Sequence, residues 1–187
     1  METVNKTQYG IEKLGYAIRD AELGTYGAIK MMPGAISLNL SRSDANNGLA
    51  ADNGKYDGGN SSKTVTGDLN VALFTNDWLI DLLGHIAESG GIGEGEGESK
   101  EFALVFQVSG NLGGARYVWY CCTASEPTAN FQTIEIDGTI QYATETAQIT
   151  SKICELSNGL RRRAWKCEVG SENYDDFFEA IFVPAAD

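Results

Sequence analysis

Histidine is nearly absent from this sequence, and so are the clusters of side chains that most catalytic sites need. The chain has one histidine, His85, and three prolines, and its four cysteines show no C-x-x-C spacing. Hydrolytic and metal-dependent enzymes usually draw on histidine or on clustered ligands. The chain has 14 basic residues against 26 acidic ones, which disfavours a surface built for nucleic acid or an anionic membrane. We therefore predict that the protein is not an enzyme and holds no cofactor or metal.

Long apolar runs are also missing. No stretch approaches the roughly 20 apolar residues of a membrane-spanning helix, and residues 1–10 show no apolar core of a secretory signal. We expect synthesis in the cytoplasm and no membrane partner. Cys121 and Cys122 are adjacent, while Cys154 and Cys167 stand apart. We interpret all four as reduced, small apolar side chains, with a disulfide scaffold as the alternative, because 187 residues can bury a stable core without one.

Two stretches of alternating side chains form the clearest pattern in the chain. Residues 36–41 and 65–73 place apolar and polar side chains in turn, a period of two that is typical of half-buried antiparallel strands. The polar positions of these strands include Ser37, Asn39, Asp68 and Asn70. We predict that one face of this strand pair is buried and the other meets water.

The connection between these two strands, residues 44–63, is rich in Gly, Asn, Asp and Ser. A connection this long without structure of its own is usually functional or disordered. We interpret it as an assembly loop, with Asp44, Asn46, Asn47, Leu49, Asp52, Lys55, Tyr56, Asp57 and Lys63 as its candidate contact residues. Asp52, Asn53, Gly54 and Asp57 faintly resemble a calcium loop, but the ligand spacing is wrong and the bidentate glutamate is missing.

A short helix is predicted over residues 75–84. Thr75 or Asn76 can cap its start, and Gly84 stands where a C-terminal glycine is favoured. Its apolar side consists of Trp78, Leu79, Leu82 and Leu83. A helix of about two turns is not stable alone, so we expect this side to pack on the sheet as a clamp. His85, just beyond, is expected to contact the C-terminal end of the helix.

The second half of the chain indicates further strands. Residues 102–108 alternate, and residues 116–123 are apolar on both faces, which predicts a hairpin with a doubly covered second strand. Asp137-Gly138 within residues 133–140 and Asn158-Gly159 predict two more turns. Residues 171–182 carry aromatic side chains at helical spacing. The predicted fold is mainly β with two short α-helices, a β-sandwich or partly closed barrel in a single domain, 1–187, with an N-terminal segment, 1–32, and a flexible Gly/Glu loop, 88–100.

Two clusters have competing interpretations. Arg161, Arg162 and Arg163 fit a solvated or ion-pairing surface, a subunit contact or, less well, a phosphate contact. Tyr117, Trp119 and Tyr120 would form a sugar-binding platform if they shared an exposed face. Because Tyr117 and Trp119 have the same parity and Tyr120 the opposite one, core packing is favoured.

Several short segments resemble one family. Similarity to the major tail proteins of long, flexible-tailed bacteriophages lies in Tyr9-Gly10-Ile11, Pro33-Gly34-Ala35-Ile36-Ser37-Leu38, Ala51-Asp52, Gly67-Asp68-Leu69 and Leu82-Leu83-Gly84. Arg116-Tyr117-Val118-Trp119-Tyr120, after an acidic Gly-rich loop, is similar to the middle strand of that family. The likeness spreads over most of the chain and rests on short patterns. The extra immunoglobulin-like domain that some members add at the C-terminus is not expected here.

The resemblance implies a tail-tube subunit that forms hexameric rings stacked into a DNA-conducting tube in the virion. It implies a tail-tube fold with a helix on the sheet, a long loop that reaches a neighbour, and partners such as tape-measure, terminator and distal tail proteins. DNA would pass through the lumen without specific binding, along candidate lining residues Asp68, Asn70, Ser37 and Asn39. The alternatives are a stand-alone β-sandwich binding module, for example for carbohydrate, and the tube protein of a contractile tail-like or secretion particle.

Overall fold

The structure is a computed structural model that describes residues 8–43, 46–51, 54–60, 64–110, 114–129, 131 and 142–185. Antiparallel pairing joins nine strands into one sheet in the order β2, β1, β9, β10, β12, β6, β3, with β11 paired to β12 and β15 to β10. The bounds are β1 Gln8–Ile18, β2 Lys30–Met31, β3 Ala35–Ser43, β6 Thr64–Val71, β9 Phe102–Gly110, β10 Arg116–Ala124, β11 Thr128–Ala129, β12 Glu145–Ser151 and β15 Ala164–Cys167.

Smaller elements surround this sheet. Three separate strand pairs are β4 Asn46–Ala51 with β5 Gly54–Asn60, β7 Ile86–Glu88 with β8 Gly91–Gly93, and β13 Cys154–Glu155 with β14 Arg161–Arg162. The helical elements are α1 Asn76–Leu83 and the 3-10 turn η1 Asp175–Phe178. The predicted mainly β fold is confirmed, with an open sheet. The second predicted helix is reduced to η1, which no side-chain hydrogen bond caps.

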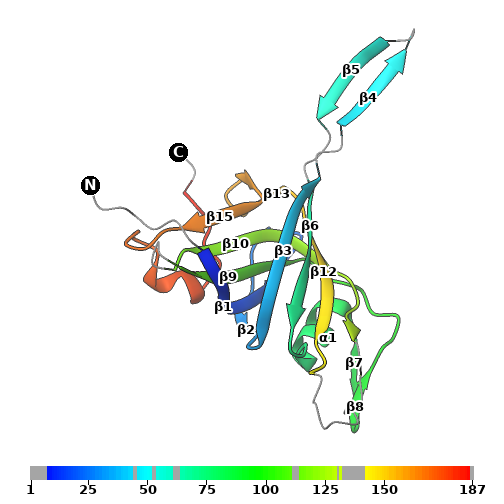
Figure 1. Cartoon of the computed structure of the whole chain (residues 1–187), viewed down its shortest axis with the longest axis vertical. Helices are drawn as coiled ribbons and strands as arrows, with labels where there is room; N and C mark the ends of the chain where they lie inside the picture. The colour runs from blue at the N-terminus through cyan, green and yellow to red at the C-terminus, as the bar shows by residue number, and fades with distance from the viewer. Residues whose placement is uncertain are drawn as a thin grey trace, which may run out of the picture.

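The large sheet folds over itself in two crossing halves. In Figure 1, β3, β6 and β12 run along the long axis of the molecule, while β9 and β10 cross them. β10 pairs with β12 at Cys122–Ala124, so the two halves join at a corner. The main hydrophobic core lies between them and includes Leu14, Leu69, Phe102, Leu104 and Ile149. This arrangement buries one face of β6 and β12 and leaves their other face outward.

Helix α1 closes the core at one end. Thr75 caps the helix, with its hydroxyl accepting a hydrogen bond from the Trp78 backbone N–H at 3.3 Å, and Gly84 ends it in a left-handed conformation with φ 75°. Trp78 is 0% exposed, and its ring centroid lies 5.1 Å from that of Tyr16 and 5.2 Å from that of Phe102. Leu82 and Leu83 are buried, and Leu79 packs against the same core. These contacts place the apolar side of α1 against the sheet, which is the packing that its spacing in the sequence suggested.

Strand β10 is covered on both faces, as its sequence predicts. Its second face belongs to another core cluster, in which Val118 and Tyr120 pack with Leu156 and Phe177. Arg116 donates to the Tyr174 carbonyl, and its guanidinium carbon lies 3.8 Å from the centre of the Tyr174 ring, which fastens η1 over this layer. The C-terminal segment is thus the cover of the second core.

Two predicted apolar positions lie outside the core. A bulge between Ala35 and Ser37 turns Ile36 outward, where it is 50% exposed. Leu73 is exposed because β6 ends at Val71. Strict alternation could not reveal a bulge or where a strand ends.

The segment 44–63 differs from the structureless loop that the sequence suggested. β4 and β5 pair in antiparallel register, with Asn46 opposite Asn60 and Leu49 opposite Asp57. Figure 1 shows this hairpin extending from the ends of β3 and β6, away from the body of the molecule. β4 and β5 carry few of the β-branched residues that are favoured in strands, so the sequence pattern did not predict these strands. Of the selected contact residues, Asp44, Asp52 and Lys63 lie outside the described residues.

Two further expectations concern connections. In the Gly/Glu segment 88–100, Glu88 pairs with Gly91 as part of the β7–β8 hairpin, so part of that loop is ordered by strand pairing. The hairpin predicted over residues 133–140 lies outside the described residues, as does most of the glycine-rich turn after β9.

Among the described residues, no helix is long and apolar enough to cross a membrane.

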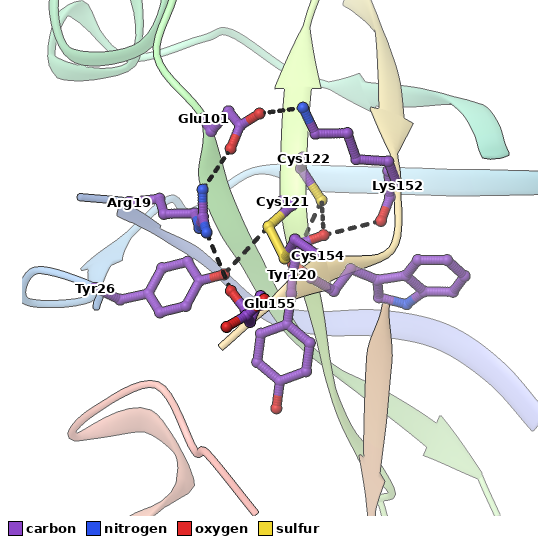
Figure 2. The surroundings of a disulfide bond; sticks show 11 residues. Arg19, Tyr26, Glu101, Tyr120, Cys121, Cys122, Lys152, Cys154 and Glu155 are labelled. Atoms are coloured by element: carbon purple, nitrogen blue, oxygen red, sulfur yellow. Dashed lines mark hydrogen bonds and ion pairs between the residues drawn. A yellow bond between two sulfur atoms is a disulfide. The ribbon is translucent and has the colours of Figure 1, made fainter. Parts of the chain in front are cut away.

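The cysteines differ from the prediction that all four are reduced. Cys121 and Cys154 form a disulfide, with their Cα atoms 6.2 Å apart, while Cys122 and Cys167 are free and buried. Figure 2 shows the bond joining β10 to β13. The sequence could not show this pairing, because β10 and β13 meet through the fold across 33 residues. Burial raises the pKa of the Cys122 thiol to about 12, so this thiol stays protonated and unreactive at neutral pH.

A polar network lies beside the disulfide (Figure 2). Arg19 Nη1 donates to Glu101 Oε2 at 2.8 Å, and the same carboxylate pairs with Lys152. Burial raises the pKa of Glu101, but Lys152 and Arg19 outweigh that effect and hold the pKa below its ordinary value. Arg19 also donates to the Glu155 carbonyl at 3.1 Å. These bonds connect β1, the start of β9 and the segment after β12 around the corner of the sheet.

The close packing of β3 on β6 depends on one glycine. A β-carbon built on Gly67 would lie 2.9 Å from Leu40 Cα and closer still to the Asn39 carbonyl, both of them backbone. We predict that Gly67→Ala lowers the free energy of unfolding by about 1–3 kcal/mol. Urea denaturation followed by circular dichroism measures this. The matched control is Gly91→Ala, because nothing lies within 4 Å of a β-carbon there; equal stability of the two variants would contradict the prediction.

The disulfide should stabilise the oxidised protein. Closing a loop of 33 residues removes unfolded-state entropy worth roughly 3–4 kcal/mol at 25 °C. We expect Cys154→Ser to lower the thermal midpoint, and a reductant to lower the midpoint of the wild type but not that of the variant. Differential scanning calorimetry measures both, and peptide mapping without reductant identifies the bond. Cys167→Ser is the control, and its midpoint should respond to reductant as the wild type does.

Candidate assembly surfaces

The outward face of β3, β6 and β12 is a continuous polar surface. Register places its side chains in three cross-strand rows, because residues directly opposite one another point to the same face. The rows are Ser37–Asn70–Thr146, Asn39–Asp68–Gln148 and Ser41–Thr66–Thr150. All nine side chains are partly or fully exposed. We call these nine residues the polar face.

The charge on the polar face is a single carboxylate. Asp68 lies in the middle row, between Asn39 and Gln148, and it is exposed. The other eight side chains are hydroxyls and amides. All four candidate lining residues chosen from the sequence, Ser37, Asn39, Asp68 and Asn70, are brought together here, and the structure adds the contribution of β12. The β12 residues were missed because the sequence does not reveal which distant strand pairs with β6.

The opposite side of the same strands is mainly apolar in its middle. Leu69 and Val71 of β6 and Ala147 and Ile149 of β12 are each at most 1% exposed. Because burial of this side fixes the register, a slip by one residue would exchange the two faces. The core therefore determines that the polar face points outward.

Strand β3 ends the sheet with a free edge. It pairs with β6 on one side, and no described strand pairs with its other side. A groove runs between this edge and β1, lined by Gly10, Ile11, Ile36, Ser37, Leu38, Asn39, Phe106 and Val108. An unpaired strand edge presents backbone N–H and C=O groups that can pair with another chain. The free edge of β3, with the exposed Ile36 beside it, is thus the part of the sheet to which a strand of another chain could be added.

The three consecutive arginines lie at the end of the molecule from which the β4–β5 hairpin leaves. Arg161 and Arg162 form β14, and they line a groove with Arg42 of β3, together with Arg163, Trp119, Ile153 and Ala164. Arg42, which the sequence did not single out, reaches the cluster because β3 ends beside the β13–β14 hairpin. We call Arg42, Arg161, Arg162 and Arg163 the basic groove.

The aromatic residues of β10 do not share an exposed platform. Tyr120 is 0% exposed in the second core, and its hydroxyl donates to the Phe182 carbonyl at 2.6 Å. Tyr117 stacks on Phe106 with centroids 5.3 Å apart, on the face of the main core. The parity inferred from the sequence is correct, and core packing accounts for these side chains.

The single histidine also has a structural environment. The His85 backbone N–H donates to the Leu79 carbonyl at 3.2 Å, at the end of α1. Its ring Nε2 lies 3.0 Å from Glu126 Oε2, a partner that the sequence did not reveal. No group of three or more potential metal ligands occurs in the described part of the chain.

Comparison with known proteins gives weak matches. No protein-family model matches the chain, and no curated protein matches its sequence. A chain of the sheath-tube complex of an extracellular contractile injection system, PVC, in its extended state has 10% identity and a TM-score of 0.45, covering 89% of this chain and 95% of that one. A chain of the PVC sheath/tube terminator has 10% identity and a TM-score of 0.45, covering 87% and 98%. A chain of the anti-feeding prophage baseplate has 7% identity and a TM-score of 0.43, covering 89% and 100%.

Proposed function

We propose that this protein is the structural subunit of a tail tube, of the kind found in long, flexible-tailed bacteriophages. The observation that carries the proposal is the polar face, which presents eight neutral polar side chains and one carboxylate on a sheet whose other side is buried. Duplex DNA that must slide through a channel requires a wetted wall without basic groups, because lysines and arginines bind phosphate by releasing counterions. The polar face is suited to line such a channel.

Ring formation is proposed through the free edge of β3. A heterologous contact, in which this edge meets a different surface of the next copy, generates a closed ring when the rotation between copies closes. The same contact covers the exposed backbone groups of β3, which would otherwise be an aggregation hazard. By the sequence resemblance, the expected ring is a hexamer, with the polar faces of its subunits turned toward the lumen.

Stacking of rings is proposed to use the β4–β5 hairpin. The hairpin extends away from the body (Figure 1), and isolated two-stranded hairpins are marginally stable in water. A neighbouring ring would supply the contacts that such an arm lacks in a single copy. The role proposed for this protein is structural rather than enzymatic, in a virion tail that also contains tape-measure, terminator and distal tail proteins.

A carbohydrate-binding role has less support. It depended on Tyr117, Trp119 and Tyr120 acting as one platform, and Tyr120 is buried on the opposite side of β10 from Tyr117. A glycan array probed with the purified protein is a direct check of that alternative.

The lining role of the polar face can be tested by adding a positive charge. Asp68→Lys would place one lysine per subunit on the channel wall, so assembled tubes should retain duplex DNA in a salt-dependent way. Filter retention of labelled duplex by purified tubes at increasing salt measures this. The control is Asp176→Lys, which makes the same charge change at an exposed position in η1. Equal DNA retention by the two variants would contradict the lining role.

Assembly itself can be tested with the concentrated protein and a hairpin deletion. Negative-stain microscopy should show rings or tubes of the wild type, whereas a variant with residues 47–60 replaced by a short Asn-Gly turn should remain folded without forming tubes. Circular dichroism and a thermal midpoint close to that of the wild type establish that the deletion is folded. A wild type that stays monomeric at high concentration would refute the tube proposal, and tubes formed by the deletion variant would refute the role of the hairpin.

A further inference from the structure

The alternating Gly-Glu run that follows β8 has a structural explanation. A β-carbon on Gly95 would lie 3.1 Å from Ile86 Cδ1, and one on Gly97 would overlap the backbone of Gly84 at the end of α1. The Lys100 backbone N–H donates to the Leu82 carbonyl at 2.9 Å, which fastens the segment to the helix. Gly97 therefore lies against the end of α1 with no room for a side chain, and Gly95 lies in close contact with Ile86. This close contact holds residues 94–100 on the end of the molecule.

The glutamates between these glycines face solvent. Glu94, Glu96 and Glu98 are exposed, and no ion pair joins them to a described residue. We call these three residues the glutamate row. In a protein with a formal charge of -12, a row of unpaired carboxylates held along a fixed backbone increases self-repulsion. Such an arrangement is useful if a basic partner covers it.

The basic groove provides the complementary surface on the same chain. Arg42, Arg161 and Arg162 are exposed, and no ion pair joins them to a described residue. Glu155, the cross-strand neighbour of Arg161, does not form an ion pair with it at 4.0 Å or less in the described structure. The partly exposed side chains of Trp119 and Ile153 add an apolar floor to the groove. Arginines gathered in this way in an acidic protein indicate an acidic ligand.

The two surfaces lie at opposite ends of the molecule. In Figure 1, β13, which pairs with β14, lies near the end of the body from which the β4–β5 hairpin leaves, whereas β7 and β8 lie at the other end of the long axis. One copy therefore cannot bring its own glutamate row to its own basic groove. Two copies placed head to tail along the long axis can.

We propose that the glutamate row of one copy docks into the basic groove of the next copy along the tube, and that this contact orients the stacking of rings. The inference rests on the proposed function, since it names the partner of the stacking step. Each single exposed ion pair is weak and screened by salt, but a ring repeats the contact in every subunit. The contact is heterologous, so repetition generates an open stack rather than a closed dimer.

The proposal is tested with two charge-reversed variants. R161E/R162E has two acidic ends, and E94K/E96K has two basic ends, so neither should stack on itself. Sedimentation velocity should show that the concentration needed for stacking rises roughly tenfold or more for each variant alone. An equal mixture of the two should stack, because every contact in an alternating array again joins opposite charges. A single chain with all four substitutions should also stack, and its net charge equals that of the wild type.

Salt and a matched control complete the experiment. Raising salt from about 0.1 M to about 1 M shortens the Debye length from roughly 10 Å to about 3 Å and should dissociate the stacks into rings. E172K/E179K makes the same change in net charge as E94K/E96K at exposed positions around η1, and it should stack as the wild type does. Circular dichroism shows that each variant is folded.

The outcomes separate this inference from the tube proposal. If R161E/R162E and E94K/E96K each form tubes normally on their own, the docking proposal is wrong and the tube proposal stands. The same conclusion holds if the two variants are folded but their mixture fails to associate. Loss of duplex DNA binding in R161E/R162E with unchanged stacking would show that the basic groove takes nucleic acid instead. If the mixture of the two variants associates but forms no rings, the result supports the docking proposal and contradicts the tube proposal.

Discussion

Burial of an apolar core between two crossing halves of one sheet is the constraint on which the rest of this structure depends. Trp78, at the end of the core, contacts aromatic rings from β1 and β9, and the inward side chains of β6 and β12 pack beside it. Because side chains on a strand alternate between faces, fixing one face inward fixes the other outward. The hydrophobic core thus sets the position of every hydroxyl and amide on the polar face, without any contact among them being required.

The same constraint explains how much of the fold was predictable. The period of two in β3 and β6, the cap at Thr75 and the glycine at Gly84 are local signals, and the structure confirms the elements they predicted. The outward position of Ile36 depends on a bulge, and the Cys121–Cys154 bond depends on which distant strands meet. Such features follow from long-range packing, so no local pattern in a single sequence carries them.

The candidate surfaces divide in the same way. The six members of the polar face on β3 and β6 were predictable from alternation, whereas its β12 members required the pairing of β6 with β12. The three consecutive arginines were visible in the sequence, but Arg42 joins them through the end of β3. The Gly-Glu run looked like a solvated loop, because a sequence does not show that Gly97 lies against Gly84. The sequence suggested candidate residues, and tertiary contacts determined what they face.

The adjacent pair Cys121 and Cys122 shows how the sheet discriminates between two chemically identical groups. The Cys122 thiol belongs to the main core, whereas Cys121 belongs to the second core, where Cys154 also lies. Cys121 and Cys122 differ by only one residue in their distance from Cys154 along the chain. In an unfolded chain, either of them could therefore form the disulfide bond with Cys154. Correct strand pairing acts as a template that selects the partner, and a bond from Cys122 to Cys154 would indicate a misfolded sheet. The identity of the disulfide in this protein therefore records whether its strands paired correctly before oxidation.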